Sequence, residues 1–321
     1  MKKITILLMG LLLISGCLDT DNPQKIEQTR TLMSTFFTIT VYDKDAAKAE
    51  IAINESFKEI ERIENVLSIY KNDSEAYLLN KNGKIDDASD DLLYVMNRSI
   101  EYGDLSDGAF DITVQPILDL YTYTFTDLKR PPTDAEINKV SKLIGYKNIV
   151  IKDRHIEFKK PGMKITLGGI AKGYAVDKVV ELLEERGVRH ALVNAGGNMR
   201  SLGDKGSEDW QIALENPRNK AEYITVIPLN NNAVSTSGDY ERYFDENKTF
   251  HHIVNPKTGY SAIELISVTV ITPKAIDCDA LSTSVFVLGK EKGIELMENL
   301  SVEGLVITRE KEIIKSKGFN Y

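Results

Sequence analysis

Two side chains near the C-terminus have the types and spacing of metal ligands. Asp279 and Thr283 lie four residues apart in the segment 277–283, which reads DCDALST. On a helix that begins near Asp279 they would share one face. A carboxylate with a hydroxyl offers the hard oxygen donors that Mg²⁺ prefers beside water and substrate phosphates. Asp is also favoured at helix starts as a cap, and on spacing alone the cap is the favoured interpretation.

A glycine-rich turn is a second candidate, in this case for binding an anion. Residues 167–173 read LGGIAKG, and glycines between a strand and a helix let the backbone approach a ligand closely. The start of that helix would point free N–H groups at a phosphate or diphosphate, with Lys172 close by. The glycine spacing matches neither a Walker A loop nor a Rossmann fingerprint, so a turn needed only for packing remains the alternative.

A histidine pair and a run of small hydroxyls complete the candidates. His251 and His252 precede residues 255–259, NPKTG, which form a turn by composition. A histidine there could contact a phosphate or move a proton near neutral pH; an exposed pair on a strand edge is the alternative. Residues 235–240, STSGDY, hold hydroxyls in an expected turn, but no G-x-S-x-G elbow surrounds them and a nucleophilic serine is rejected. Together, the metal, anion and histidine segments predict a site for a diphosphate ligand with a divalent metal.

The elements that position these residues follow from apolar spacing. Residues 45–70 carry apolar side chains three or four apart and predict an amphipathic helix; further helices are expected at 92–102, 170–186 and 280–288. Residues 121–133 are expected to form an exposed loop, and the order of elements over 163–194 predicts one βαβ unit. Because strict alternation is absent, the fold class is α+β, with mixed sheets and packed helices. Strands are expected at 33–42, 148–151 paired with 156–158, 163–167, 190–194, 211–214, 223–229 and 267–271.

The first residues predict export and a lipid anchor. Lys2 and Lys3 precede an apolar run over 4–13, and residues 14–16 (ISG) are followed by Cys17. The run is about half the length that spans a bilayer. We therefore expect residues 1–16 to be a lipoprotein signal, Cys17 to carry a lipid, residues 17–29 to be a flexible tether and residues 30–321 to form a single domain. An ordinary cleaved signal with a coincidental cysteine is the alternative.

Composition limits the partners and the sources of stability. The 321 residues carry a net charge of -8 without a marked basic cluster, which argues against nucleic acid as a partner. Four histidines exclude a His-rich metal cluster, and a hydrophobic content of 42% suffices for a large packed core. With Cys17 lipidated, Cys278 has no cysteine to pair with, so stability must come from that core.

Five motifs in order resemble the ApbE family of FAD:protein FMN transferases. They read LGGIAKGYAVDKV, NAGGN, AVSTSGDYERYF, HHIVNPKTGY and DALSTSVFVLG, and MSTFFTITVY and SDGAFDITVQP fit the same pattern, so the resemblance covers residues 31–315. It implies an α+β fold with an FAD cleft between two lobes. It also implies Mg²⁺-dependent cleavage of FAD, transfer of FMN to a threonine or serine of a target protein, and release of AMP.

The resemblance also implies roles for individual residues. His252, Asp279 and Lys172 would be catalytic, with His252 as the favoured base and Asp239 a weaker candidate. The Mg²⁺ site would comprise the Gly169 carbonyl, Asp279 and Thr283, with Ser282 adjacent. The FAD site would comprise Met33, Tyr70, Ala109, Phe110, Asp111, Thr166, Lys172, Tyr240, His252 and Ile253.

Two positions depart from the family pattern, and the activity has alternatives. Thr166 and Asn255 stand where members commonly have Asp, which could weaken a second metal position or shift the balance between transfer and hydrolysis. The expected acceptors are extracytoplasmic domains of membrane redox proteins, such as Rnf or Na⁺-translocating NADH:quinone reductase subunits. A metal-dependent FAD pyrophosphatase and a non-catalytic flavin-binding lipoprotein are the alternatives.

Overall fold

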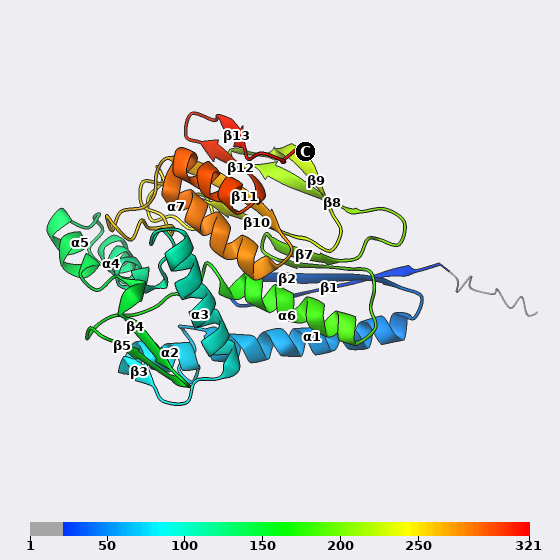
Figure 1. The fold of residues 1–321 in the computed structure, drawn as a ribbon, viewed down its shortest axis with the longest axis horizontal. Coiled ribbons are helices and arrows are strands. Elements are labelled where there is room, and N and C mark those ends of the chain that lie inside the picture. The colour runs from blue at the N-terminus through cyan, green and yellow to red at the C-terminus, as the bar shows by residue number, and fades with distance from the viewer. Residues whose placement is uncertain (1–21) are drawn as a thin grey trace, which may run out of the picture.

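An eight-stranded sheet is the centre of the molecule, seen in a computed structural model that describes residues 22–321 (Figure 1). Every strand pairing in that part of the chain is antiparallel. In spatial order the strands are β1 (Gln24–Leu32), β2 (Thr35–Asp43), β6 (Ala191–Ala195), β7 (Asn198–Leu202), β10 (Ala233–Gly238), β11 (Leu265–Thr272), β12 (Glu303–Thr308) and β13 (Ile313–Lys315).

The two faces of this sheet are covered by different elements. Helices α1 (Ala46–Leu67), α6 (Ala171–Glu185) and α7 (Ala275–Asn299) pack on one face (Figure 1). The hairpin of β8 (Trp210–Asn216) and β9 (Asn219–Leu229) lies over the other. Because neighbouring residues of a strand point to opposite faces, Val306 of β12 joins the helix-side core, whereas Leu305 and Ile307 pack with the hairpin.

A second part of the chain, mostly helical, lies beside the sheet (Figure 1). A three-stranded sheet, ordered β3–β5–β4, belongs to it, and the main hydrophobic core runs through both parts without interruption. The α+β class is therefore confirmed. The elements of this part are α2 (Glu75–Asn82), β3 (Lys84–Ile85), α3 (Asp90–Leu105), α4 (Gln115–Thr126), α5 (Asp134–Ser141), β4 (Ile149–Lys152) and β5 (His155–Phe158), with single 3₁₀ turns at Ile112–Val114 and Tyr146–Asn148.

Helix α1 shows how the sequence pattern becomes structure. Asp45 accepts a hydrogen bond from the Lys48 N–H at 3.0 Å and caps the first turn. The apolar residues that predicted the helix form its buried stripe and are at most 2% exposed: Ala49, Ile53, Phe57, Ile60, Ile63 and Leu67. The hairpin over 148–158 and the strands expected at 190–194, 211–214, 223–229 and 267–271 are likewise confirmed.

The loop expected over residues 121–133 is wrong for its first half. Helix α4 continues to Thr126, and Tyr121 is fully buried. The Tyr121 hydroxyl donates to the Gly259 carbonyl at 2.7 Å, and its ring meets Phe244 and Phe250 edge-on. Aromatic residues that suggested an exposed loop therefore form a small core with a segment more than a hundred residues away.

The βαβ unit expected over 163–194 is also wrong. Residues 163–167 are extended but form no strand, and β6 pairs antiparallel with β2 and β7. The backbone of Ile165 is satisfied by a side chain instead: Asn80 donates to its carbonyl at 2.8 Å and accepts from its N–H at 2.7 Å. The side chain of one asparagine thus makes the backbone hydrogen bonds that a neighbouring strand would otherwise make.

The flexible tether expected up to residue 29 ends earlier than the sequence suggests. Residues 24–29 belong to β1 and pair with β2 from Gln24↔Asp43 to Thr29↔Thr38. Their polar composition suits an edge strand whose exposure alternates along its length. The signal segment and Cys17 lie outside the described residues. Within residues 22–321, no helix is both long and apolar enough to cross a membrane.

Candidate functional site

A cavity of about 310 Å³ lies where the sheet and the helical part meet. Its walls come from the start of β2, the segment after α3, the beginning of α6, strand β10 and helix α7. The sequence-predicted residues that line it are Tyr70, Ala109, Phe110, Asp111, Thr166, Gly169, Lys172, His252, Ile253, Asp279 and Thr283.

The glycine-rich turn forms the junction between the cavity and α6. A side chain at Gly169 would begin 3.1 Å from the Thr283 hydroxyl and 3.3 Å from the Phe110 ring, so the backbone itself lies against both. The Lys172 ammonium donates to the Gly168 carbonyl at 3.0 Å and lies 4.0 Å from an Asp279 oxygen. The turn follows an extended segment rather than the expected strand, yet it still presents a helix start and a lysine to the cavity.

Asp279 is not a helix cap. Helix α7 begins at Ala275 with Lys274 as its N-cap, so Asp279 lies in the second turn, facing the cavity. Its Oδ2 accepts from the Gly173 N–H at 3.1 Å, and Asn198 lies close enough to lower the pKa of this carboxyl. Burial raises the pKa of this carboxyl, while Lys172 acts in the opposite direction. A buried carboxylate with so few charge partners favours a bound cation.

The hydroxyls around Asp279 complete a set of oxygen donors. Thr283 lies one turn further along α7, and its Oγ1 is 3.5 Å from the Ser237 Oγ on β10. Ser282 is fully buried and does not line the cavity; its Oγ contacts Ser237 at 2.8 Å and donates to the Asp279 carbonyl at 3.1 Å.

The chemistry of these donors fits Mg²⁺. The carboxylate, the hydroxyl and the Gly169 backbone are hard ligands. Within residues 22–321, no group of three or more His, Cys, Asp or Glu side chains is placed to hold a metal ion. A cation at this wall would thus have one carboxylate, that of Asp279, among its protein ligands.

The two histidines have different environments, and neither forms the exposed strand-edge pair that was the alternative. His251 is fully buried, and its Nε2 donates to the Ala262 carbonyl at 2.9 Å. His252 lines the cavity, and its Nδ1 donates to the Arg242 carbonyl at 3.0 Å. Burial lowers the pKa of His252 to about 3. The ring is therefore neutral at neutral pH, with Nε2 able to accept a proton.

The segment after α3 forms the opposite wall. The Ser106 hydroxyl accepts from the Phe110 N–H at 2.8 Å and fixes the turn. Asp111 accepts from the Thr113 N–H at 2.8 Å and from the Tyr146 N–H at 2.9 Å, and burial raises the pKa of its carboxyl. Asp111 thus stabilises the backbone of this wall by capping the turn that follows it. Tyr70, 71% exposed, leaves an aromatic face open at the edge of the cavity.

Three predicted residues lie just outside the main cavity. Met33 lines a neighbouring cavity of about 90 Å³, which shares Tyr70, Thr166 and Lys172 with the first. Tyr240 lies behind Gly238, because a Cβ added at Gly238 would lie 2.3 Å from the Tyr240 ring. Ser282 is the third. The weaker base candidate Asp239 is 1% exposed and forms a two-pronged ion pair with Arg218, at 2.8 and 2.6 Å.

The departures from the family pattern have different consequences. Thr166 does line the cavity, and its hydroxyl accepts from the Gly168 N–H at 3.3 Å. Asn255 does not line it; its side chain accepts from the Lys257 N–H at 2.9 Å and stabilises the NPKTG turn. The Asp-to-Asn departure therefore removes no carboxylate from the cavity wall.

Several lining residues were missed by sequence reasoning, although motif segments contain them. Residues 235–238 were expected in a turn but belong to β10, which brings Thr236 and Ser237 to the cavity. Asn198 and Arg242 lie within the quoted segments NAGGN and AVSTSGDYERYF, which was the available signal. Other missed lining residues are Ser34, Thr35, Ile112, Val114, Leu118, Gly168, Gly196, Gly238, Glu241 and Val254.

This arrangement has the donors that would suit a phosphate-containing ligand and a hard cation. The family model described as the ApbE family matches residues 33–306, and the chain belongs to that family. It is 36% identical over 267 residues to the FAD:protein FMN transferase of Haemophilus influenzae, covering 78% of this chain and 77% of the relative. It is 29% identical over 330 residues to the Escherichia coli protein of the same name, covering 97% and 93%.

Solved structures agree with this assignment. The ApbE protein of Thermotoga maritima superposes with a TM-score of 0.85 at 33% identity, covering 92% of this chain and 98% of the other. The flavin transferase ApbE of Vibrio cholerae gives a TM-score of 0.83 at 26% identity, with the same coverage. The family resemblance stated from the ordered motifs is confirmed.

Proposed function

We propose that this enzyme is a flavin transferase that cleaves the diphosphate of FAD and attaches FMN through a phosphoester to a threonine or serine of a protein, releasing AMP. The observation that carries the proposal is the meeting of Asp279, Thr283 and Lys172 with the Gly169 turn on one cavity wall. These groups suit a diphosphate and a hard cation. Family membership supplies the class of reaction.

The reaction needs one bond to form and one to break at phosphorus. The acceptor hydroxyl oxygen attacks the phosphorus of the FMN half, and the bond from that phosphorus to the bridging oxygen breaks. AMP leaves with the bonding electrons. Positioning and charge neutralisation supply most of the rate in such transfers. Lys172, whose ammonium lies 4.0 Å from Asp279, places a positive charge where the diphosphate is proposed to bind.

The hydroxyl proton must go to a base, and His252 is the proposed acceptor. Its Nδ1 is engaged by the Arg242 carbonyl, so Nε2 carries the lone pair. The low pKa of this buried ring, about 3, makes it a weak base. A bound diphosphate would raise this pKa, because negative charge nearby favours the protonated imidazole.

Asp279, Thr283 and the Gly169 carbonyl are proposed to hold Mg²⁺. When bound, the ion would neutralise charge on the diphosphate and so stabilise the departing AMP phosphate. The oxygen-only donor set and the buried carboxylate support this choice. Ser282, behind the wall, would orient Thr283 through their shared neighbour Ser237.

The place of action is proposed to be outside the cytoplasm. The signal pattern before Cys17 supports export and a lipid anchor in a bacterial membrane. The proposed acceptors are therefore extracytoplasmic domains of membrane electron-transfer proteins, of the Rnf or Na⁺-translocating NADH:quinone reductase kind.

The test is incubation of the purified protein with FAD, Mg²⁺ and a candidate acceptor domain, followed by mass spectrometry. Addition of FMN less one water to a single threonine or serine, with one AMP released, is the expected result. Accumulation of free FMN and AMP with no labelled acceptor would instead identify an FAD pyrophosphatase. Tight FAD binding that is indifferent to Mg²⁺ and to Asp279→Asn, without turnover, would identify a flavin-binding protein.

A further inference from the structure

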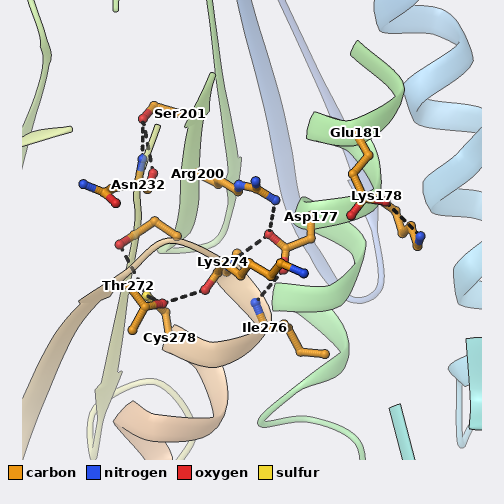
Figure 2. A network of polar contacts seen from close by, with 12 residues as sticks. Asp177, Lys178, Glu181, Arg200, Ser201, Asn232, Thr272, Lys274, Ile276 and Cys278 are labelled. Atoms are coloured by element: carbon orange, nitrogen blue, oxygen red, sulfur yellow. Dashed lines mark hydrogen bonds and ion pairs between the residues drawn. The ribbon is translucent and has the colours of Figure 1, made fainter. Parts of the chain in front are cut away.

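We infer that Asp177 and Arg200 are positioning residues that determine where Asp279 lies in the proposed cation site. Neither residue lines the main cavity, and neither is assigned a role by the sequence analysis. Resting on the function proposed above, this assigns cation affinity to a polar network behind the cavity wall. Figure 2 shows that network, with Asp177 between Arg200 and the start of α7.

Helix α7 is capped by another helix rather than by its own N-cap residue. The N-cap, Lys274, makes no side-chain hydrogen bond to the first turn. Asp177 of α6 accepts from the Ala275 N–H at 2.9 Å and from the Ile276 N–H at 3.0 Å. A carboxylate is favoured at a helix N-terminus because it satisfies free amides and meets the positive end of the helix dipole. The first turn of the helix that carries Asp279 is thus held by Asp177 of α6.

Arg200 fixes Asp177 from the sheet side. Its Nη1 donates to the Asp177 carboxylate at 2.7 Å, and both side chains are mostly buried. Its Nε is also buried and has no hydrogen-bond partner within residues 22–321. An unsatisfied buried donor costs stability, so keeping Arg200 in this position lowers the free energy of unfolding.

The same two elements also contact Asp279 directly. On α6, Gly173 donates to Asp279 and lies one turn before Asp177. On β7, Asn198 lies close enough to Asp279 to lower the pKa of its carboxyl, two residues before Arg200 on the same face of the strand. Helix α6 therefore contacts α7 twice, at its first turn through Asp177 and at Asp279 through Gly173, whereas β7 reaches the first turn through the Arg200–Asp177 pair.

This double attachment makes the position of Asp279 depend on Asp177. Asp279 follows Ala275 by four residues, so a shift of the first turn of α7 carries Asp279 with it. Residues behind a metal site that orient its ligands typically change metal affinity by about 10- to 100-fold when replaced. A cap that acted only on stability would leave cation affinity unchanged.

The test measures Mn²⁺ binding, as a probe for Mg²⁺, by the electron paramagnetic resonance signal of free Mn²⁺ with the full chain and saturating FAD. Asp177→Asn keeps the shape, but its single side-chain oxygen can cap only one of the two amides, and it cannot form an ion pair with Arg200. We expect its Mn²⁺ dissociation constant to rise about tenfold, while FAD binding without metal stays within about twofold of wild type.

Glu136→Gln is the matched control. Glu136 is also a carboxylate that completes a helix N-terminus, at α5, and pairs with an arginine, Arg130, at 2.8 Å. It does not line the cavity. We expect this variant to lose thermal stability but to bind Mn²⁺ like wild type.

A second variant tests the idea even if Asp177→Asn does not fold. Arg200→Gln leaves both amide caps in place, and we expect about threefold weaker Mn²⁺ binding, largely restored in Arg200→Lys. Wild-type affinity in Asp177→Asn, or in Arg200→Gln, would overturn the role of this pair alone. Absence of Mn²⁺ binding by the wild-type FAD complex would overturn the proposed cation site together with it.

Discussion

Gly173 lies where helices α6 and α7 touch, and replacing it with alanine tests how far the site depends on that contact. A Cβ there would lie 2.3 Å from the Ala275 carbonyl oxygen and 2.7 Å from the Ile276 Cα. Both are backbone atoms, which cannot rotate away. Since ordinary contacts begin near 3.4 Å, the two helices must separate by about 1 Å.

The separation has two measurable effects. Overpacking costs about 1–3 kcal/mol, and the better helix propensity of alanine returns about 1 kcal/mol, so we expect a net loss of up to about 2 kcal/mol in the free energy of unfolding. For a domain of this size that lowers Tm by up to about 3 °C. Displacement of Asp279 and Lys172 relative to each other by about 1 Å is expected to lower the transfer rate about 100-fold.

The assays are thermal unfolding by circular dichroism and the initial rate of flavin attachment to an acceptor domain, measured well below Tm. Gly293→Ala is the control, because its Cβ would begin 2.8 Å from the Val285 side chain on the same helix. Gly293 lies beyond Gly289, where the helix is interrupted, so stability should fall while the rate is kept. A Gly173→Ala enzyme within threefold of the wild-type rate, or an equal loss in Gly293→Ala, would refute the reasoning.

Four further outcomes are expected. Asp279→Asn should abolish Mn²⁺ binding and lower transfer at least about 10³-fold while FAD is still bound; retained turnover by mass spectrometry would contradict the metal assignment. His252→Gln should lower kcat about 10²- to 10⁴-fold with little change in KM for FAD, so an unchanged kcat would exclude it as the base. Burial raises the pKa of Asp279, so protons compete with the cation above the ordinary carboxyl range; Mn²⁺ should bind more weakly at pH 5 than at pH 7.5 in titrations, and pH-independent binding would count against this. Cys17→Ser should move the protein from the membrane to the soluble fraction on immunoblots, and unchanged fractionation would argue against the lipid.

The spacing argument predicted the shared face of Asp279 and Thr283 better than it predicted the helix around them. Asp279 and Thr283 share a helical face as expected, although α7 begins at Ala275 and extends to Asn299. Four-residue spacing is insensitive to where a helix starts, so the pair survives an error in the boundary. The cap interpretation depended on that boundary and is wrong, because Lys274 is the N-cap of α7; the metal-ligand interpretation stays a prediction.

The features that sequence could not supply are contacts between distant segments. Asn80 replaces a strand for Ile165, and Tyr121 is buried by aromatic residues of the 244–250 segment. Asp177 caps a helix almost a hundred residues away. No local pattern predicts such partners, because Asn, Tyr and Asp side chains are also common on exposed surfaces. The family motifs located the cavity only because they already encode these distant contacts.

The early start of β1 limits how far the cavity could lie from the bilayer if the protein carries the proposed lipid anchor. If the proposed lipid on Cys17 is the attachment point, the chain from there to Gln24 reaches at most about 25 Å. Strand β1 then runs nine residues, about 30 Å, to the Met33–Ser34 turn, where Ser34 lines the cavity. The cavity can therefore stand no more than about 55 Å from the bilayer surface. With the proposed anchor, an acceptor hydroxyl farther than this from the bilayer would be out of reach, so the short tether would select acceptors by their height above the membrane.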